Sequence, residues 1–228
     1  MKFYVDIADL DQIKAVAEYF PIDGITTNPK ILAKSPQPIE ELMVEFKKLA
    51  EENDWEVFFQ VTCEKAEDML QQAIKLHDYY GKHLIVKIPC TKEGYKATQL
   101  IKAKGIKVCV TTIHSVMQAV LAAKAGADYV APYINHFDNY GVDGSDCVAS
   151  MLTAFVDGGH DCQVLGASLK NVLQIQRLAE VGCQAVTITP DMFDTLIAHT
   201  STDSAMESFK QAWEAKFQDK QLSDFIPR

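Results

Sequence analysis

The sequence predicts an α/β protein that consists of one (β/α)8 TIM barrel with an additional C-terminal helix. Three observations support this prediction. Short apolar runs alternate with stretches of helical periodicity along all 228 residues, which is typical of a parallel sheet with right-handed crossovers. Runs such as Leu84–Ile88 are apolar at nearly every position, as expected for strands that are buried on both faces. The junction from Asp6 to Gln12 lacks the glycine-rich phosphate loop of an open doubly wound sheet.

The apolar runs predict eight strands, a number that favours a closed barrel. These strands are Phe3–Asp6, Gly24–Thr26, Val57–Val61, Leu84–Ile88, Val108–Thr111, Tyr129–Tyr133, Val164–Ala167 and Ala185–Ile188. The chain is slightly shorter than the roughly 250 residues of a typical barrel of this kind. Because no linker, composition shift or low-complexity segment divides it, residues 1–228 are expected to form a single domain.

Two local signals mark where barrel helices begin. Asp9 and Gln12 have the spacing of an N-terminal capping pair for the helix after the first strand. Thr189 and Pro190 supply a cap and a first-turn proline for the helix after the last strand. Both signals place a helix directly after a predicted strand, as the barrel requires.

A further helix is predicted at residues 202–219, with Ser204 and Glu207 as its capping box. Apolar side chains recur on one of its faces, namely Met206, Phe209, Trp213 and Phe217. This stripe fits a helix that packs onto its own barrel or one that contacts a neighbouring subunit. Because eight helices already cover the eight strands, the neighbouring subunit is the favoured partner, and the helix is expected to mediate oligomerisation.

Composition and charge exclude several classes of protein. Hydrophobic residues make up 48% and charged residues 23%, as in ordinary globular domains with one sizeable core. The formal net charge of −9 gives no electrostatic attraction to nucleic acid or to an anionic membrane, and neither is expected as a partner. An anionic substrate would need a local group of donors.

The cysteines and the N-terminal segment predict a cytoplasmic location. The six cysteines contain no C-x-x-C pair and fit neither a disulfide framework nor a zinc site, which favours reduced thiols. The first ten residues are too short and too charged for a signal peptide, and no apolar run reaches the roughly 20 residues of a membrane span. The acidic residues at 138, 143 and 146 do not fit a calcium loop, and no metal site is expected.

Polar residues stand at the predicted ends of seven strands. In barrels of this type the active site lies at the carboxyl ends of the strands. The residues found there are Asp6, Thr26 with Asn28 just after it, Gln60, Lys87, Thr111, Tyr133 and Ser168. Because side chains alternate along a strand, Gln60 shares a face with Phe58, and Lys87 shares one with Ile85. If those faces point inward, one polar group from each strand reaches the same mouth.

Lys87 is the most informative of these residues because it is the only charged residue in an apolar strand. Burial of an ammonium group is unfavourable and lowers its pKa, which makes the neutral amine available as a nucleophile towards a carbonyl. The alternative is a lysine at a strand end whose ammonium group reaches water. The polar groups on the other strands favour the catalytic interpretation.

Seven motifs together resemble the transaldolase family. They read FYVDIADL, DGITTNPKIL, FFQVT, LIVKIPCT, AGADYVAPYIN, GASLKNVLQI and VTITPDMF, and they span nearly the whole chain. Their order and spacing are most similar to the short branch of the family, the fructose-6-phosphate aldolases. This resemblance implies an enzyme that needs no cofactor and acts on a small sugar or sugar phosphate. It also implies homo-oligomers built from rings, often decamers of two pentameric rings.

The resemblance also implies roles for individual residues. Lys87 would form a Schiff base with the ketose carbonyl, and Asp6 would orient or deprotonate a substrate hydroxyl near the bond that breaks. Asn28, next to Thr26, would bind the dihydroxyacetone part of the substrate. Ser168 and Lys170 would hold its phosphate.

Two positions distinguish the branches of the family. Transaldolases proper tend to have Glu and Phe where this chain has Gln60 and Tyr133. Together with Thr111, these two residues resemble the aldolase branch, in which the trio holds the water that relays protons. A transaldolase that transfers dihydroxyacetone between sugar phosphates stays open as an alternative, as does a non-catalytic barrel that binds a sugar phosphate.

His136 departs from the family pattern. The family usually has an arginine at this position, four residues after the proline of the sixth strand. Histidine cannot form the bidentate contact of a guanidinium group and is largely neutral at pH 7. A weakly held phosphate, another anionic tail such as a sulfonate, and an unphosphorylated sugar therefore stay open as substrates.

Overall fold

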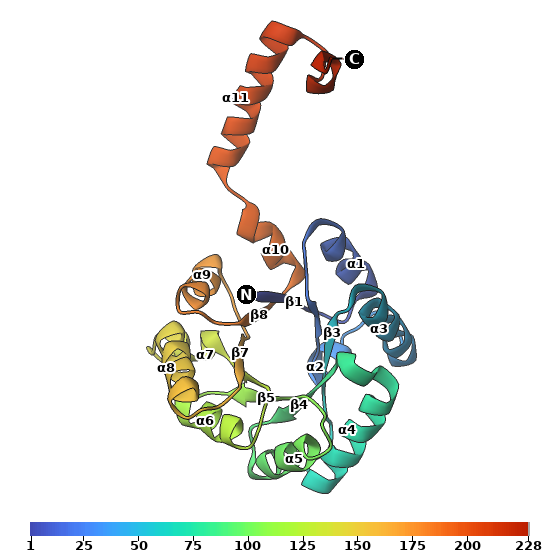
Figure 1. Cartoon of the computed structure of the whole chain (residues 1–228), viewed down its shortest axis with the longest axis vertical. Helices are drawn as coiled ribbons and strands as arrows, with labels where there is room; N and C mark the ends of the chain where they lie inside the picture. The colour runs from blue at the N-terminus through green and yellow to red at the C-terminus, as the bar shows by residue number, and fades with distance from the viewer. Residues whose placement is uncertain (228) are drawn as a thin grey trace. The chain divides into compact units, whose positions relative to one another are not determined.

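The computed structural model describes residues 1–227, and within them eight strands close into a barrel in sequence order (Figure 1). Every neighbouring pair is parallel, including β1 with β8, which closes the ring. The strands are β1 (Lys2–Asp6), β2 (Gly24–Thr26), β3 (Glu56–Gln60), β4 (Leu84–Pro89), β5 (Val108–Ile113), β6 (Tyr129–Pro132), β7 (Gln163–Gly166) and β8 (Ala185–Ile188). The predicted (β/α)8 fold is thus confirmed, with strand ends displaced by at most two residues.

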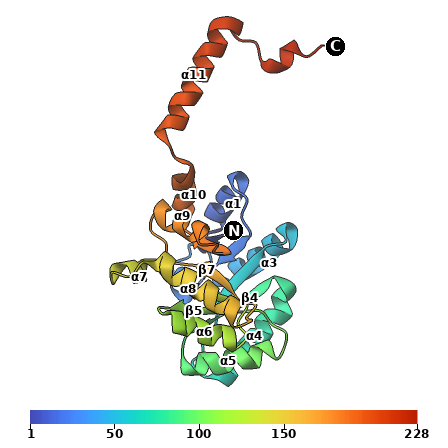
Figure 2. The same ribbon diagram turned by 60° about the vertical axis from the view of Figure 1, so that its left-hand side comes forward.

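Helices follow the strands around the outside of the barrel (Figures 1 and 2). They are α1 (Leu10–Tyr19), α2 (Pro29–Leu32), α3 (Ile39–Asn53), α4 (Ala66–Tyr80), α5 (Lys92–Lys102), α6 (Val116–Lys124), α7 (Ile134–Asn139), α8 (Gly144–Asp157), α9 (Val172–Glu180) and α10 (Pro190–Ile197). A 3-10 turn, η1 (Gly81–His83), precedes β4. Asp9 caps α1 as predicted, since its carboxylate accepts hydrogen bonds from the backbone of Asp11 and Gln12. No described helix is long and apolar enough to cross a membrane.

The chain forms two compact units, residues 1–193 and the segment from Asp194 onward. The second unit contains α11 (Thr200–Phe217) and the 3-10 turn η2 (Leu222–Phe225). The predicted capping box at Ser204 and Glu207 is wrong, because α11 begins at Thr200 and is capped by His199. Ser204 lies inside the helix, where its hydroxyl donates to the Thr200 carbonyl.

The apolar stripe predicted on α11 divides into two parts. Trp213 and Phe217 pack against each other with ring centroids 4.5 Å apart, and Phe225 of η2 covers both. The Trp213 indole N–H donates to the Lys220 carbonyl at 2.7 Å and fixes this fold-back. Met206 and Phe209 stay 60% and 65% exposed. The sequence pattern could not show this division, because η2 follows the helix and has no periodicity of its own.

A layer of inward-facing side chains fills the barrel. It comprises Tyr4, Phe58, Ile85, Cys109, Tyr129, Ala131, Leu165, Ala167 and Ala185. The Phe58 ring makes edge-to-face contacts with Tyr4 and Tyr129, at centroid distances of 5.0 and 5.5 Å. Side chains two residues further along the same strands share this inward direction. The packed layer therefore aims Asp6, Gln60 and Lys87 at the open carboxyl end of the barrel.

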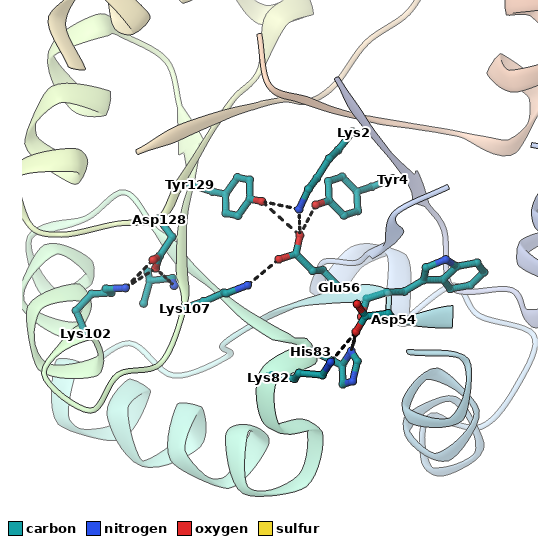
Figure 3. Close-up of polar contacts among 12 residues, drawn as sticks. Lys2, Tyr4, Asp54, Glu56, Lys82, His83, Lys102, Lys107, Asp128 and Tyr129 are labelled. Atoms are coloured by element: carbon teal, nitrogen blue, oxygen red, sulfur yellow. Dashed lines mark hydrogen bonds and ion pairs between the residues drawn. The ribbon is translucent and has the colours of Figure 1, made fainter. Parts of the chain in front are cut away.

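A polar network closes the amino end of the barrel around Glu56 (Figure 3). Lys2 and Lys107 contact the two oxygens of its carboxylate at 2.8 and 2.9 Å, and Tyr4 donates a short hydrogen bond to it. Burial by itself would raise the pKa of Glu56, but the bonds from Lys2, Tyr4 and Lys107 outweigh it and lower the pKa to about 2. Tyr129 also donates to this carboxylate, at 3.3 Å. The network therefore stabilises the end of the barrel opposite the candidate site.

Candidate active site

Lys87 is buried in the mouth of the barrel, with 5% of its surface exposed. Its Nζ donates to the backbone carbonyl of Thr27 at 2.8 Å. Burial lowers the pKa of Lys87, and the nearby carboxylate of Asp6 and thiol of Cys109 raise it in part. The Lys87 side chain is therefore buried in the mouth and does not extend into bulk water.

Asp6 ends β1 and is held by a chain of hydroxyl groups. Thr26 Oγ1 donates to its carboxylate at 2.7 Å and lies 2.5 Å from Thr187 Oγ1 on β8. Burial raises the pKa of Asp6, while Lys87, the hydroxyl of Thr26 and the charge of Lys170 lower it. Asp6 and Lys87 thus each stabilise the charged form of the other, whereas burial favours the neutral form of both. Thr26 thus holds the Asp6 carboxylate in place through a direct hydrogen bond.

Thr111 on β5 and Tyr133, the residue directly after β6, lie at the same mouth. Thr111 Oγ1 is buried, and among residues 1–227 it makes no hydrogen bond of ordinary length, although the Tyr133 phenol lies near enough to interact with it. The Tyr133 ring packs against the interior layer. Burial raises the pKa of Tyr133, and the adjacent Thr111 hydroxyl lowers it. A buried hydroxyl without a hydrogen bond of ordinary length is a place where a substrate group or a water molecule is expected.

A β-bulge in β5 shifts the register of this strand against β6. The shift sets the position of Thr111 relative to Tyr133. Thr111 pairs with Ala131, but Ile113 pairs with Pro132, which leaves Thr112 as an extra residue. Thr112 has a φ of 60°, a left-handed conformation that is costly for a β-branched residue. Its hydroxyl donates to the Thr111 carbonyl at 2.6 Å and accepts from the Cys90 amide at 3.3 Å. The bulge therefore joins the end of β4 to the end of β5.

Gln60 and Asn28 occupy the other side of the mouth. Gln60 pairs in register with Lys87, which places the two on adjacent strands at the same level. Asn28 follows β2 and caps α2, since its Oδ1 accepts from the Ile31 amide at 3.0 Å. The cap occupies the side-chain oxygen and leaves the amide N–H groups of Asn28 as donors for a ligand.

Ser168 and Lys170 lie in the loop between β7 and α9. Ser168 has a φ of 57°, a left-handed conformation like that of Thr112. The Lys170 side chain is exposed, and its charge lowers the pKa of Asp6. The loop thus brings the ammonium group of Lys170 towards the same mouth. Ser168 adds a hydroxyl group, and its backbone is in a strained conformation.

His136 lies on α7 beside His114, a residue to which the sequence analysis assigned no function. Its ring stacks on that of His114, with centroids 5.1 Å apart and planes inclined by 11°. Both rings meet Tyr133 edge to face, each at 5.3 Å. Neither imidazole can form the bidentate contact of a guanidinium group.

Sequence reasoning missed several groups that complete the mouth, namely the Thr27 carbonyl, Cys109, His114, Thr112 and Thr187. Alternation along Val108–Thr111 is a signal that could have placed Cys109 on the same inward face as Thr111. The bulge at Thr112 has no signal in the local pattern, because threonine is an ordinary strand residue. Among residues 1–227 no cluster of three or more His, Cys, Asp or Glu side chains has the arrangement of a metal site.

The fold resembles that of other barrels at low sequence identity. The chain matches a structure titled "Native KDPGal structure" with a TM-score of 0.59 and 13% identity, covering 94% of this chain and 95% of the other. It matches thiamine phosphate pyrophosphorylase from Pyrococcus furiosus with a TM-score of 0.56 and 16% identity, covering 94% and 96%. Identities this low show the shared architecture alone.

Sequence comparison is more specific. The chain is 38% identical over 218 residues to a probable transaldolase of Desulfotalea psychrophila, covering 96% of this chain and all of the relative. It is 35% identical over 215 residues to probable transaldolase 2 of Listeria monocytogenes, covering 94% and 97%. Residues 3–225 match the family described as Transaldolase/Fructose-6-phosphate aldolase. The protein is an enzyme of the aldolase or transferase type. The chain belongs to the transaldolase/fructose-6-phosphate aldolase family.

Proposed function

We propose that the protein is a lysine Schiff-base aldolase that cleaves or forms the C3–C4 bond of a ketose, with dihydroxyacetone as donor. The observation that carries this proposal is Lys87, a buried amine whose pKa is lowered by burial and which lies beside the carboxylate of Asp6. A neutral amine in a closed site attacks a ketone, whereas an ammonium group does not.

The reaction begins when Lys87 Nζ attacks the C2 carbonyl and water leaves, which produces an iminium ion. Asp6 accepts the proton of the C4 hydroxyl, and the C3–C4 bond breaks as that oxygen becomes an aldehyde. The bonding electrons are held as an enamine conjugated to the nitrogen. Protonation at C3 and hydrolysis of the regenerated iminium ion then release dihydroxyacetone and free Lys87. Every proton and electron is thus supplied by the substrate, water and this set of side chains.

Protonation of the enamine is assigned to Tyr133 through a water molecule held by Gln60 and Thr111. The buried hydroxyl of Thr111 supports this assignment, since it lies beside the Tyr133 phenol without a hydrogen bond of ordinary length, and a water molecule between the two would supply one. Burial also keeps the Tyr133 phenol protonated, because it raises the pKa. Asn28 is proposed to bind the dihydroxyacetone part. Ser168 and Lys170 are proposed to bind the phosphate of a phosphorylated substrate.

Transaldolase activity is the second candidate, and the names of the relatives favour it. In that reaction an aldose captures the enamine before it is protonated, and dihydroxyacetone passes to the acceptor. Gln60 and Tyr133 favour the aldolase outcome, because a phenol beside the buried Thr111 hydroxyl offers a proton to the enamine. The two outcomes differ in whether free dihydroxyacetone accumulates without an acceptor.

Borohydride trapping tests the mechanism. Wild-type protein treated with dihydroxyacetone or fructose 6-phosphate and borohydride is expected to gain the mass of one reduced adduct on Lys87, because only an iminium ion is reduced in this way. Lys87→Arg keeps a positive charge and is expected to show no adduct, while Lys170→Arg controls for labelling of an exposed lysine in the same mouth. An unchanged mass of the wild type would overturn the Schiff-base mechanism.

A homo-oligomer is proposed as the working form, with the C-terminal helix as its contact. The exposed Met206 and Phe209 on α11 support this proposal, since large apolar side chains that stay exposed commonly mark interfaces. The family resemblance adds a decamer of two pentameric rings as the expected assembly.

A further inference from the structure

A buried hydroxyl group on β8 lies next to the candidate site, and the proposed mechanism gives it no role. Thr187 is 4% exposed and shares the inward face of β8 with Ala185, which belongs to the packed interior layer. Its Oγ1 lies 2.5 Å from Thr26 Oγ1, the one hydrogen-bond partner that this hydroxyl has among residues 1–227. Burial of a hydroxyl is unfavourable without a hydrogen bond, and a valine of the same shape would fill the space without that requirement. The contact with Thr26 therefore accounts for the polar group.

The two threonines come from the strands on either side of β1. Thr26 on β2 pairs in register with Asp6, whereas Thr187 on β8 pairs with Tyr4, two residues earlier on β1. The contact between the hydroxyls thus crosses the inner face of β1 and joins two strands that do not pair with each other. Both neighbours of β1 therefore act on the hydroxyl that donates to Asp6.

The direction of these hydrogen bonds follows from the protons available. Thr26 has one hydroxyl proton, which goes to the Asp6 carboxylate at 2.7 Å, because an ionised carboxylate can only accept. Thr187 must then donate to Thr26. In the opposite direction the Thr187 proton would have no acceptor among residues 1–227. The chain of hydroxyls is thus fully satisfied when Asp6 is ionised, which is the state of a general base.

We propose that Thr187 is a positioning residue that fixes the Asp6 carboxylate through the hydroxyl of Thr26. The inference rests on the proposed function, because it concerns the group that accepts the proton of the C4 hydroxyl. A hydroxyl that accepts one hydrogen bond while it donates another is held at two points and is a stronger donor. Because Thr187 acts through Thr26, its effect is expected on the rate of C–C cleavage and not on substrate binding.

Other groups also act on the Asp6 carboxylate. Burial raises the pKa of Asp6, whereas Lys87 on β4, the hydroxyl of Thr26 and the charge of Lys170 in the loop after β7 lower it. Tyr133, directly after β6, lies near enough for the charge of Asp6 to raise the pKa of the phenol. A substitution on β8 leaves all of these groups in place.

A pair of substitutions separates the hydroxyl of Thr187 from the shape of its side chain. Thr187→Val keeps the shape and loses the hydroxyl, whereas Thr187→Ser keeps the hydroxyl and loses the methyl group. With fructose 6-phosphate, Thr187→Val should lower kcat about three- to tenfold, the effect of one hydrogen bond, and leave KM nearly unchanged. Thr187→Ser should keep most of the wild-type kcat. Thr98→Val is the matched control, because Thr98 is fully buried in α5 and its hydroxyl donates to the Gly94 carbonyl of the same helix.

The pH dependence of kcat distinguishes positioning from packing. Thr187→Val removes a donor from the chain that favours ionised Asp6, so the pKa of Asp6 should rise. Because cleavage requires ionised Asp6, the acid limb of the kcat profile should move to higher pH in Thr187→Val. It should stay in place in Thr187→Ser and Thr98→Val. An unchanged profile in Thr187→Val would overturn the proposal, and so would an equal loss of kcat in Thr187→Ser, which would indicate packing.

Carbon-13 NMR of the Asp6 carboxyl carbon tests the inference without turnover. The signal is assigned by its absence in Asp6→Asn, and its titration midpoint should lie at higher pH in Thr187→Val than in the wild type. If borohydride does not label Lys87 but this midpoint rises, the Schiff-base mechanism fails and the positioning of Asp6 by Thr187 stands. If Lys87 is labelled and the midpoint does not move, the mechanism stands and the proposal for Thr187 fails.

Discussion

The Nζ atom of Lys87 donates a hydrogen bond of 2.8 Å to the backbone carbonyl of Thr27, across the mouth of the barrel. The bond uses one N–H of the amine and holds the nitrogen in place. A neutral amine held in this way keeps its lone pair for attack on a carbonyl. Because burial lowers the pKa of Lys87, the protein also favours the protonation state that attack requires.

The pH dependence of Schiff-base formation should therefore differ from that of an exposed lysine. The rate of adduct formation with dihydroxyacetone is expected to rise with pH and to reach half of its maximum well below the ordinary lysine pKa of about 10.4. The Asp6 carboxylate raises the pKa of Lys87. Asp6→Asn should accordingly move the midpoint to lower pH, as measured by mass spectrometry of borohydride-quenched samples. A midpoint that moved upward would contradict the electrostatic relationship between the two residues.

Tyr133→Phe tests the proton relay. The variant keeps the ring and its contacts with His114 and His136, but it loses the phenolic proton. Release of free dihydroxyacetone from fructose 6-phosphate should fall by about 10²-fold or more, in the range of general acid–base groups. The Lys87 adduct should still form. If the wild type releases no dihydroxyacetone but transfers it to erythrose 4-phosphate, the transaldolase alternative is correct.

Lys170→Ala tests how a phosphate is held. The variant should raise the KM for a phosphorylated ketose and leave that for an unphosphorylated ketose nearly unchanged, since Lys170 brings a cation to the mouth. Steady-state kinetics with fructose 6-phosphate and fructose make the comparison. Equal effects on both sugars would show that Lys170 does not contact the phosphate.

His136→Arg is the complementary change at the position where the family usually has arginine. A guanidinium group would add a charge-assisted contact and should tighten phosphorylated substrates by on the order of 1 kcal/mol or more. The KM for fructose should not decrease in this variant.

Glu56→Gln tests the network at the amino end of the barrel. The lowered pKa of Glu56, about 2, means that its ionised form stabilises the fold. This contribution is complete above the unfolded pKa of about 4.3 and is lost as the pH falls towards about 2. At pH 7 the variant should lower the free energy of unfolding by on the order of 2 kcal/mol. The difference in the free energy of unfolding between the wild type and the variant should decrease as the pH falls below about 4.3.

Urea unfolding at a fixed protein concentration measures this effect. Glu67→Gln is the matched control, because Glu67 pairs with Lys96 on the surface, where both side chains are more than half exposed. Exposed pairs contribute little to stability. A Glu56→Gln variant as stable as Glu67→Gln at pH 7 would show that the network is not stabilising.

Removal of the residues after His199 tests the proposed oligomer contact. The truncation deletes α11 with Met206 and Phe209 and should lower the mass measured by light scattering. The circular dichroism of the barrel should change little, because residues 1–193 form a compact unit of their own. A wild-type protein that is monomeric at micromolar concentration would contradict the proposed assembly.

The sequence by itself determined the barrel and the strand on which, or directly after which, each polar group lies. Apolar runs such as Leu84–Ile88 and capping pairs such as Asp9 with Gln12 act within a few residues, and their effect can be predicted from local patterning. Alternation along a strand also gave the inward direction of Lys87 and Gln60. These predictions need only the geometry of a strand and the rule that active sites lie at the carboxyl ends.

Tertiary structure alone decided how those groups meet. The bulge at Thr112 sets the offset between Thr111 and Tyr133, and it depends on the register of β5 against β6. The stack of His114 on His136 joins the loop after β5 to α7, and Glu56 gains its partners from β1, from β6 and from the loop before β5. Such contacts arise only when the barrel closes, because closure fixes distances between segments that are far apart in sequence. Local patterning carries no information about those distances.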